Sequence, residues 1–235
     1  MSVIELEDRS AYRQSLNEAL TIDPSRTAVV TIDMQREYLD ETVGQSVVVA
    51  SEAERMLSAN KAFLDQCRDL NIPVVHAYVV RRTEEVESGF HSGGLAYTMT
   101  AQSLGVSQMP HRPARSHPDR VLGTPASEVP AELAAPGDIH VTSKKSLDSF
   151  LDTDLGFLLR RILKVKYLLM CGINTDTCVY STTLTAANQG YWPIVVSDCV
   201  ASMRGIDSHR MALELMSRSI AWVMPGTEVI ARLQD

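Results

Sequence analysis

The sequence lacks what a nucleic-acid-binding or membrane protein would need. Its 235 residues include 22 Lys and Arg against 29 Asp and Glu, so the formal net charge is −7 and no basic excess is available for phosphate groups. No apolar run approaches the roughly 20 residues that span a membrane. The N-terminus, with Glu5, Glu7, Asp8 and Arg9, does not resemble a signal peptide. We therefore expect neither a nucleic-acid nor a membrane partner.

Cysteine is scarce as well. The four cysteines, Cys67, Cys171, Cys178 and Cys199, form no Cys-x-x-Cys pair and no cluster with histidine at zinc-binding spacing. Cys171 and Cys199 fall in apolar runs typical of buried strands, which predicts small core side chains there. Unpaired thiols suit a reducing compartment, so we expect a cytoplasmic protein.

Short apolar runs alternate with helical patterns along the chain. This alternation predicts an α/β fold with three layers, namely a six-stranded, mainly parallel sheet with helices on both faces. We expect strands at 27–33, 74–80, 139–142, 167–171, 194–197 and 220–224. We expect helices at 11–20, 51–70, 153–163, 176–190, 207–218 (with Asp207 as its cap) and 227–233.

The domain organisation that we predict is simple. Residues 1–25 are expected to form an N-terminal arm, and residues 26–235 a single domain. Residues 81–137 interrupt the regular alternation with many glycines and prolines and several Arg and His. Such a long irregular excursion is typical of a lid, a binding loop or an oligomer contact.

Reactive side chains follow three of the predicted strands. Cys178 lies between an apolar run and a helical pattern, where the helix dipole and free backbone N–H groups favour the thiolate form. Asp33 ends the first strand, and Lys144 follows the third. Because binding sites in parallel sheets form at the carboxyl ends of strands, we expect these three residues to share one site.

Four motifs in order resemble the isochorismatase-like cysteine hydrolases. They occupy residues 30–35, 141–155, 172–179 (Gly-Ile-Asn-Thr-Asp-Thr-Cys-Val) and 190–199. The resemblance implies a six-stranded parallel sheet and a homodimer or homotetramer. It also implies cleavage of the C–N bond of a small amide, urea or carbamoyl compound. Within the family, the sequence around Cys178 looks most like the biuret hydrolase and N-carbamoylsarcosine amidase branches.

The family's functional residues can be carried over by motif. The resemblance implies a catalytic triad of Asp33, Lys144 and Cys178. It implies a cis peptide between Ile173 and Asn174, and an oxyanion hole formed by the amides of Asn174 and Cys178. In this mechanism the thiol forms a thioester and Asp33 moves the protons.

Five further residues are candidates for substrate binding: Gln35, Tyr38, Arg82, Phe150 and Asn174. Alternative roles are a surface turn for Gln35, core packing for Phe150 and Tyr38, and a solvated loop for Arg82. One or two arginines of the excursion are expected to clamp a substrate carboxylate, since the guanidinium group suits bidentate recognition. Besides Arg82, the candidates are Arg81, Arg112, Arg115 and Arg120.

No metal or other cofactor is expected. The nicotinamidase branch carries an Asp/His/His metal site near the end of the second strand, whereas residues 78–84 here contain no Asp-x-His. The sequence therefore predicts a metal-independent cysteine amidohydrolase that releases ammonia or an amine, and it disfavours nicotinamide as substrate.

Two alternatives remain open. One is isochorismatase-type hydrolysis of a vinyl ether with release of pyruvate. Family members with that chemistry need the Asp and the Lys but not the Cys, so Cys178 argues against it. The other is a catalytically silent binding protein, which an intact triad disfavours.

Overall fold

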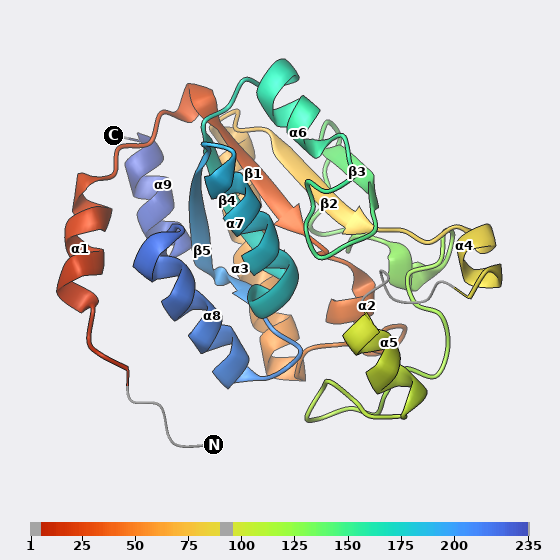
Figure 1. The fold of residues 1–235 in the computed structure, drawn as a ribbon. Helices are drawn as coiled ribbons and strands as arrows, with labels where there is room; N and C mark the ends of the chain where they lie inside the picture. Colours follow the sequence, from red (N-terminus) through yellow and green to blue (C-terminus); the bar gives the residue numbers. More distant parts are fainter. Residues whose placement is uncertain (1–5, 90–95, 235) are drawn as a thin grey trace.

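The computed structural model describes residues 6–89 and 96–234. Its six strands form one parallel sheet in the order β3-β2-β1-β4-β5-β6 (Figure 1). The predicted fold class is confirmed, with every strand pair parallel. The strands are β1 Thr27–Ile32, β2 Val74–Val79, β3 Ile139–Lys144, β4 Tyr167–Ile173, β5 Trp192–Ala201 and β6 Trp222–Met224. Within the described part of the chain, no helix is both long and apolar enough to cross a membrane.

Helices cover both faces of the sheet (Figure 1). On one face, α3 (Ala50–Asp69) and α9 (Gly226–Gln234) pack on a cluster that includes Val29 and Leu169. On the other face, α6 (Leu155–Phe157), α7 (Tyr180–Asn188) and α8 (Ile206–Ser219) pack on a cluster that includes Val30 and Leu168. All of β1 and β4 is buried, which explains why these strands read as continuous apolar runs.

The strand β5 is longer than the apolar run 194–197 predicts. Its far end pairs with β4 after a register shift, so that Gly172 lies opposite Val200. One polar residue of this segment, Asp198, has a partner from another element: its carboxylate accepts a hydrogen bond of 2.8 Å from the Gly226 N–H. A polar interruption in the sequence therefore does not end the strand.

Two helix starts differ from expectation. Gly205, not Asp207, is the N-cap of α8, and Asp207 lies in the first turn without a side-chain cap bond. The helix expected at 153–163 begins at Leu155 and continues after α6 as a π-helical turn, Leu158–Ile162.

The N-terminal arm packs beside β6. Its helix α1 spans Ser10–Ala19. The Trp222 indole N–H donates to the carbonyl of Leu16 at 3.0 Å, and Leu20 and Ile22 are buried in the core. The described part of the arm is therefore attached to the sheet edge.

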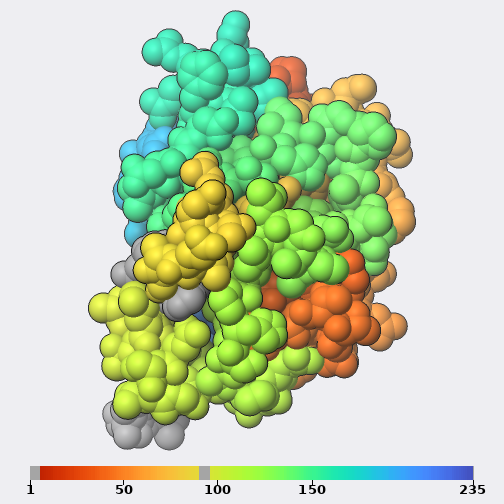
Figure 2. All heavy atoms as spheres, turned by 90° about the vertical axis from the view of Figure 1, so that its right-hand side faces the viewer, coloured from red at the N-terminus to blue at the C-terminus, as the bar shows by residue number. Residues whose placement is uncertain are grey.

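The excursion lies beyond the carboxyl ends of the strands. It contains α4 (Thr83–Glu87), α5 (Ala96–Ser103) and the 3-10 turn Pro125–Ser127, and it faces α2 (Arg36–Leu39) across this end of the molecule (Figure 1). Figure 2 shows the face that it covers, where yellow to green atoms gather. Backbone hydrogen bonds between Arg81 and the segment 120–122 join its start to its later part.

Candidate active site

Cys178 lies just past the carboxyl end of β4. The strand ends at Ile173, the Ile173–Asn174 peptide bond is cis, and Asn174 caps the π-helical turn Thr175–Val179 that leads into α7. The Asn174 side-chain oxygen accepts a 2.9 Å hydrogen bond from the Met203 N–H, which ties this turn to the segment after β5. Cys178 is 7% exposed, and it lines a pocket.

Asp33 follows β1 directly and is fully buried. Its φ of 50° lies in the left-handed region, which costs a non-glycine residue about 1–3 kcal/mol. The turn aims the carboxylate along the strand ends, where one oxygen accepts from the Val79 N–H at 3.2 Å. The other oxygen accepts from the Lys144 ammonium at 2.7 Å. Backbone strain thus accompanies a fixed orientation of this acid.

Lys144 reaches the same point from the sheet edge. It ends β3, which is separated from β1 by β2, and its side chain is buried. The ammonium nitrogen lies 2.7 Å from an Asp33 oxygen and 3.5 Å from the Cys178 sulfur. The neighbouring Lys145 turns elsewhere, to the Val80 carbonyl and the Glu85 carboxylate. The three side chains singled out in the sequence therefore lie within contact distance of one another.

The resting state of this cluster follows from burial and charge. Burial raises the pKa of the Cys178 thiol; Lys144 opposes this effect, and the Asp33 carboxylate adds to it. Burial therefore favours the neutral thiol at rest, in the opposite direction to the effect expected of the helix start. Burial by itself would lower the pKa of Lys144, but Asp33 and Cys178 raise it, so the lysine stays charged. A neutral thiol beside an acid and an ammonium is set for proton transfer.

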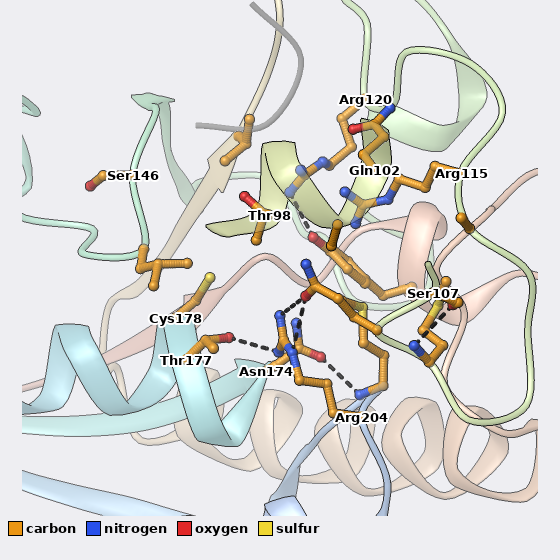
Figure 3. A pocket seen from close by; sticks show the side chains of 18 of the residues that line it. Thr98, Gln102, Ser107, Arg115, Arg120, Ser146, Asn174, Thr177, Cys178 and Arg204 are labelled. Atoms are coloured by element: carbon orange, nitrogen blue, oxygen red, sulfur yellow. Dashed lines mark hydrogen bonds between the residues drawn. The ribbon is translucent and has the colours of Figure 1, made fainter. Parts of the chain in front are cut away.

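Two of the predicted substrate-binding residues line the pocket. Asn174 does so beside the thiol (Figure 3). Tyr38 does so from α2, where its hydroxyl accepts a 2.7 Å hydrogen bond from Arg120. Burial raises the pKa of Tyr38 to about 12, so the phenol is neutral.

Three others lie elsewhere. The Gln35 amide is buried and donates to the carbonyls of Val79 and Ser127, so it braces the end of β2. Phe150 is in the core and stacks on Tyr191, with ring centroids 5.9 Å apart. Arg82 is exposed as the N-cap of α4. None of the three lines the pocket, so a direct contact with substrate is not supported for them.

The pocket wall is strongly cationic. No acidic side chain is among the described residues that line it, and ten of the lining residues are labelled in Figure 3. Its positively charged lining residues are Arg81, Arg115, Arg120, Lys144, Lys145 and Arg204.

Arg204 was not singled out in the sequence. It donates to the Gln108 side chain at 2.9 Å and to the Thr177 hydroxyl at 3.2 Å (Figure 3). It therefore links the Cys178 turn to the excursion. It lies five residues after the predicted core cysteine Cys199 and just beyond the carboxyl end of β5, a position that the rule for parallel sheets would have singled out.

Among residues 6–89 and 96–234, no three His, Cys, Asp or Glu side chains lie close enough to hold a metal ion. The four cysteines are all free and buried. The reactive groups of the site are the pocket-lining thiol of Cys178, several pocket-lining cations and the Asp33 carboxylate, which contacts Lys144 behind the lining.

Comparison with known proteins gives consistent matches. Residues 27–228 match the family described as Isochorismatase domain. The chain is 30% identical over 186 residues to a ureidoacrylate amidohydrolase of Agrobacterium fabrum. The aligned region covers 77% of this chain and 78% of that protein. A cysteine hydrolase structure from Pseudomonas syringae pv. phaseolicola 1448A superposes with a TM-score of 0.69 at 24% identity, over 92% of this chain and 95% of that one.

A further solved structure has the same fold. The N-carbamoylsarcosine amidase from Thermoplasma acidophilum superposes with a TM-score of 0.60 at 21% identity, over 86% of this chain and 96% of that chain. At such identities the two structural likenesses speak for the fold alone.

Proposed function

Because this chain belongs to the isochorismatase family, we propose that it is a metal-independent cysteine hydrolase that cleaves the C–N bond of a small amide, ureide or N-carbamoyl compound. The observation that carries the proposal is the contact of one lysine with both a carboxylate and a thiol, at 2.7 and 3.5 Å, on the wall of a pocket. The sequence similarity to a ureidoacrylate amidohydrolase supports the choice of bond.

In the first half of the reaction, the Cys178 sulfur attacks the substrate carbonyl carbon while its proton passes to Asp33. Backbone amides of Asn174 and Cys178 are proposed to stabilise the tetrahedral oxyanion, and one such donor is typically worth about 3–4 kcal/mol. Asp33 then gives the proton to the leaving nitrogen, the C–N bond breaks and a thioester remains. The amine or ammonia departs neutral.

In the second half, water attacks the thioester and gives a proton to Asp33. The C–S bond breaks, the sulfur recovers that proton, and the acid is released. Lys144 keeps its charge throughout, so it balances the carboxylate at rest and the developing thiolate during attack.

The vinyl-ether alternative makes a different prediction about the thiol. A reaction that needs only Asp33 and Lys144 does not explain why the Cys178 thiol lies beside both of these residues. We therefore place it second, and release of pyruvate from isochorismate is its test.

The proposal is tested by ammonia release. Wild type, Cys178→Ser and Cys67→Ser would be assayed with biuret, triuret, N-carbamoyl amino acids, ureidoacrylate, maleamate and nicotinamide. Cys67 is a buried cysteine of α3 outside the pocket, so it controls for the substitution itself. We expect ammonia from at least one compound with wild type and Cys67→Ser, and none with Cys178→Ser. A Cys178→Ser protein that keeps more than a few per cent of the activity would contradict the covalent mechanism.

A further inference from the structure

The charges around the pocket do not balance. Its six cationic lining residues pair with five carboxylates, which belong to Asp33, Glu37, Glu85, Asp119 and Asp176. None of these five acids lines the pocket, so the charged groups at the pocket surface are the cations alone. One positive charge is therefore in excess even when every acid is ionised.

The excess is concentrated around Asp119. This buried carboxylate receives three guanidinium groups, with Arg81 at 2.9 Å, Arg120 at 2.7 Å and Arg115 at 3.2 Å. The remaining acid of the group, Glu37, lies 3.7 Å from Arg115, and burial raises its pKa. Three fixed cations thus share at most two negative charges in a place shielded from water.

Two of these arginines keep donors in reserve, whereas each guanidinium nitrogen of Arg120 already contacts Asp119 or the Tyr38 hydroxyl. Arg81 is 1% exposed, and within the described residues only its Nε has a hydrogen-bond partner. Arg115 uses Nε and Nη1 on Ser46, Glu37 and Asp119, and its Nη2 has no partner among the described residues. Arg115 and Arg120 contact the same Asp119 oxygen, so their head groups are neighbours, and Figure 3 shows both across the pocket from Cys178.

We infer that the substrate is a monoanion whose carboxylate binds the Arg115–Arg120 pair while its amide or ureide carbonyl meets Cys178. This inference rests on the proposed function for the position of the reacting carbonyl. Guanidinium groups match a carboxylate with two parallel charge-assisted hydrogen bonds. An uncharged amide would leave a buried positive charge without a partner, which is costly. The excess of one charge fits one carboxylate.

The test uses two small thiol reagents that differ in charge, so it does not depend on knowing the substrate. Iodoacetate and iodoacetamide both alkylate a cysteine as its sulfur displaces iodide, but only iodoacetate carries a carboxylate. The rate of each reaction at Cys178 would be measured by mass spectrometry, and the ratio compared with that of a free small thiol. We expect the ratio at Cys178 to exceed the free-thiol ratio by about tenfold or more.

Two variants make the assignment specific. Arg115→Gln should lower the ratio by about tenfold. The control is Arg112→Gln in the same excursion, whose side chain is similarly exposed (21% against 19%) but binds Glu41 and Gly44 and does not line the pocket. The control should leave the ratio unchanged. A ratio no greater than that of the free thiol, or one equally insensitive to both variants, would overturn the inference.

The outcomes separate this inference from the proposed function. If maleamate and its neutral diamide maleamide release ammonia equally well, the hydrolase proposal stands and the carboxylate site falls. If the alkylation ratio depends on Arg115 but no compound releases ammonia, the anion site stands and the hydrolase proposal falls. If neither reagent alkylates Cys178, the nucleophile assignment and the inference that rests on it both fail.

Discussion

Replacing Lys144 by methionine separates the two tasks of this residue. The side chain is 1% exposed and lies between Asp33, at 2.7 Å, and the Cys178 sulfur, at 3.5 Å. Methionine keeps much of the volume and removes the charge. Asp33 would then be an unpaired buried carboxylate, and the thiolate formed during attack would lose its nearest cation.

The expected magnitudes follow from these distances. Removing one partner of a buried ion pair costs about 3–5 kcal/mol of unfolding free energy. The attraction between Lys144 and a thiolate at 3.5 Å is about 5 kcal/mol at an effective dielectric constant of about 20, which corresponds to a loss of several thousandfold in kcat/KM. Lys145→Met is the matched control; its partner Glu85 is part-exposed, so it should cost less than about 1 kcal/mol.

Urea unfolding and the ammonia assay would measure both effects. The double variant Asp33→Asn, Lys144→Met has neither charge of this buried pair, so it should recover most of the lost stability and none of the activity. If the double variant is no more stable than Lys144→Met, the account of the buried pair is wrong. If Lys144→Met keeps near wild-type activity while Lys145→Met does not, the lysine has been assigned one residue out of place.

Two further predictions concern folding. Burial by itself would raise the pKa of Asp119, but three arginines hold this pKa well below its usual range. The ionised Asp119 therefore stabilises the folded state above the unfolded pKa of 3.8, and this stabilisation is lost as the pH falls below that value. Between pH 5 and pH 2.5 the unfolding free energy should therefore fall more steeply in wild type than in Asp119→Asn, and equal slopes in urea titrations would refute this. Gly172 has φ +120°, and an added Cβ would lie 2.1 Å from the Ile32 carbonyl oxygen, so Gly172→Ala should fail to give folded protein by circular dichroism. Gly156→Ala, where the nearest atom is at 3.5 Å, should fold; recovery of a folded Gly172→Ala would show that the strands can move apart there.

The sheet was predictable because parallel strands buried on both faces must be apolar throughout. Runs such as 27–32 and 167–171 have that character, and they form β1 and most of β4. The extension of β5 to Ala201 was not predictable, because the N–H group that satisfies the Asp198 carboxylate comes from Gly226, outside the strand. The sequence motifs also predicted the family correctly.

The positions of the reactive residues were predictable for a related reason. Asp33, Lys144 and Cys178 each lie at or just beyond a strand end, and parallel strands bring their carboxyl ends together. The orientation of neighbouring side chains was not predictable, because it depends on turns. Arg81 faces the pocket, whereas the next residue, Arg82, points to solvent.

The excursion held the least sequence information and supplies much of the pocket. Arg115 and Arg120 were named among several candidates, but no periodic pattern distinguishes them from Arg112. What distinguishes Arg115 and Arg120 is their contact with Asp119. This buried acid of the same excursion was not among the predicted site residues, and its carboxylate contacts both guanidinium groups. Long-range ion pairs of this kind leave no local signature.

The contact between Lys144 and Asp33 joins residues that are 111 positions apart, and it runs from an edge strand past its neighbour. Contacts of such sequence separation carry a large loop-closure cost and depend on the strands between them being in place. The reactive cluster therefore exists only when β3 is paired with β2. Catalytic activity should return during refolding no earlier than this edge of the sheet closes, so an activity assay would also time the docking of β3.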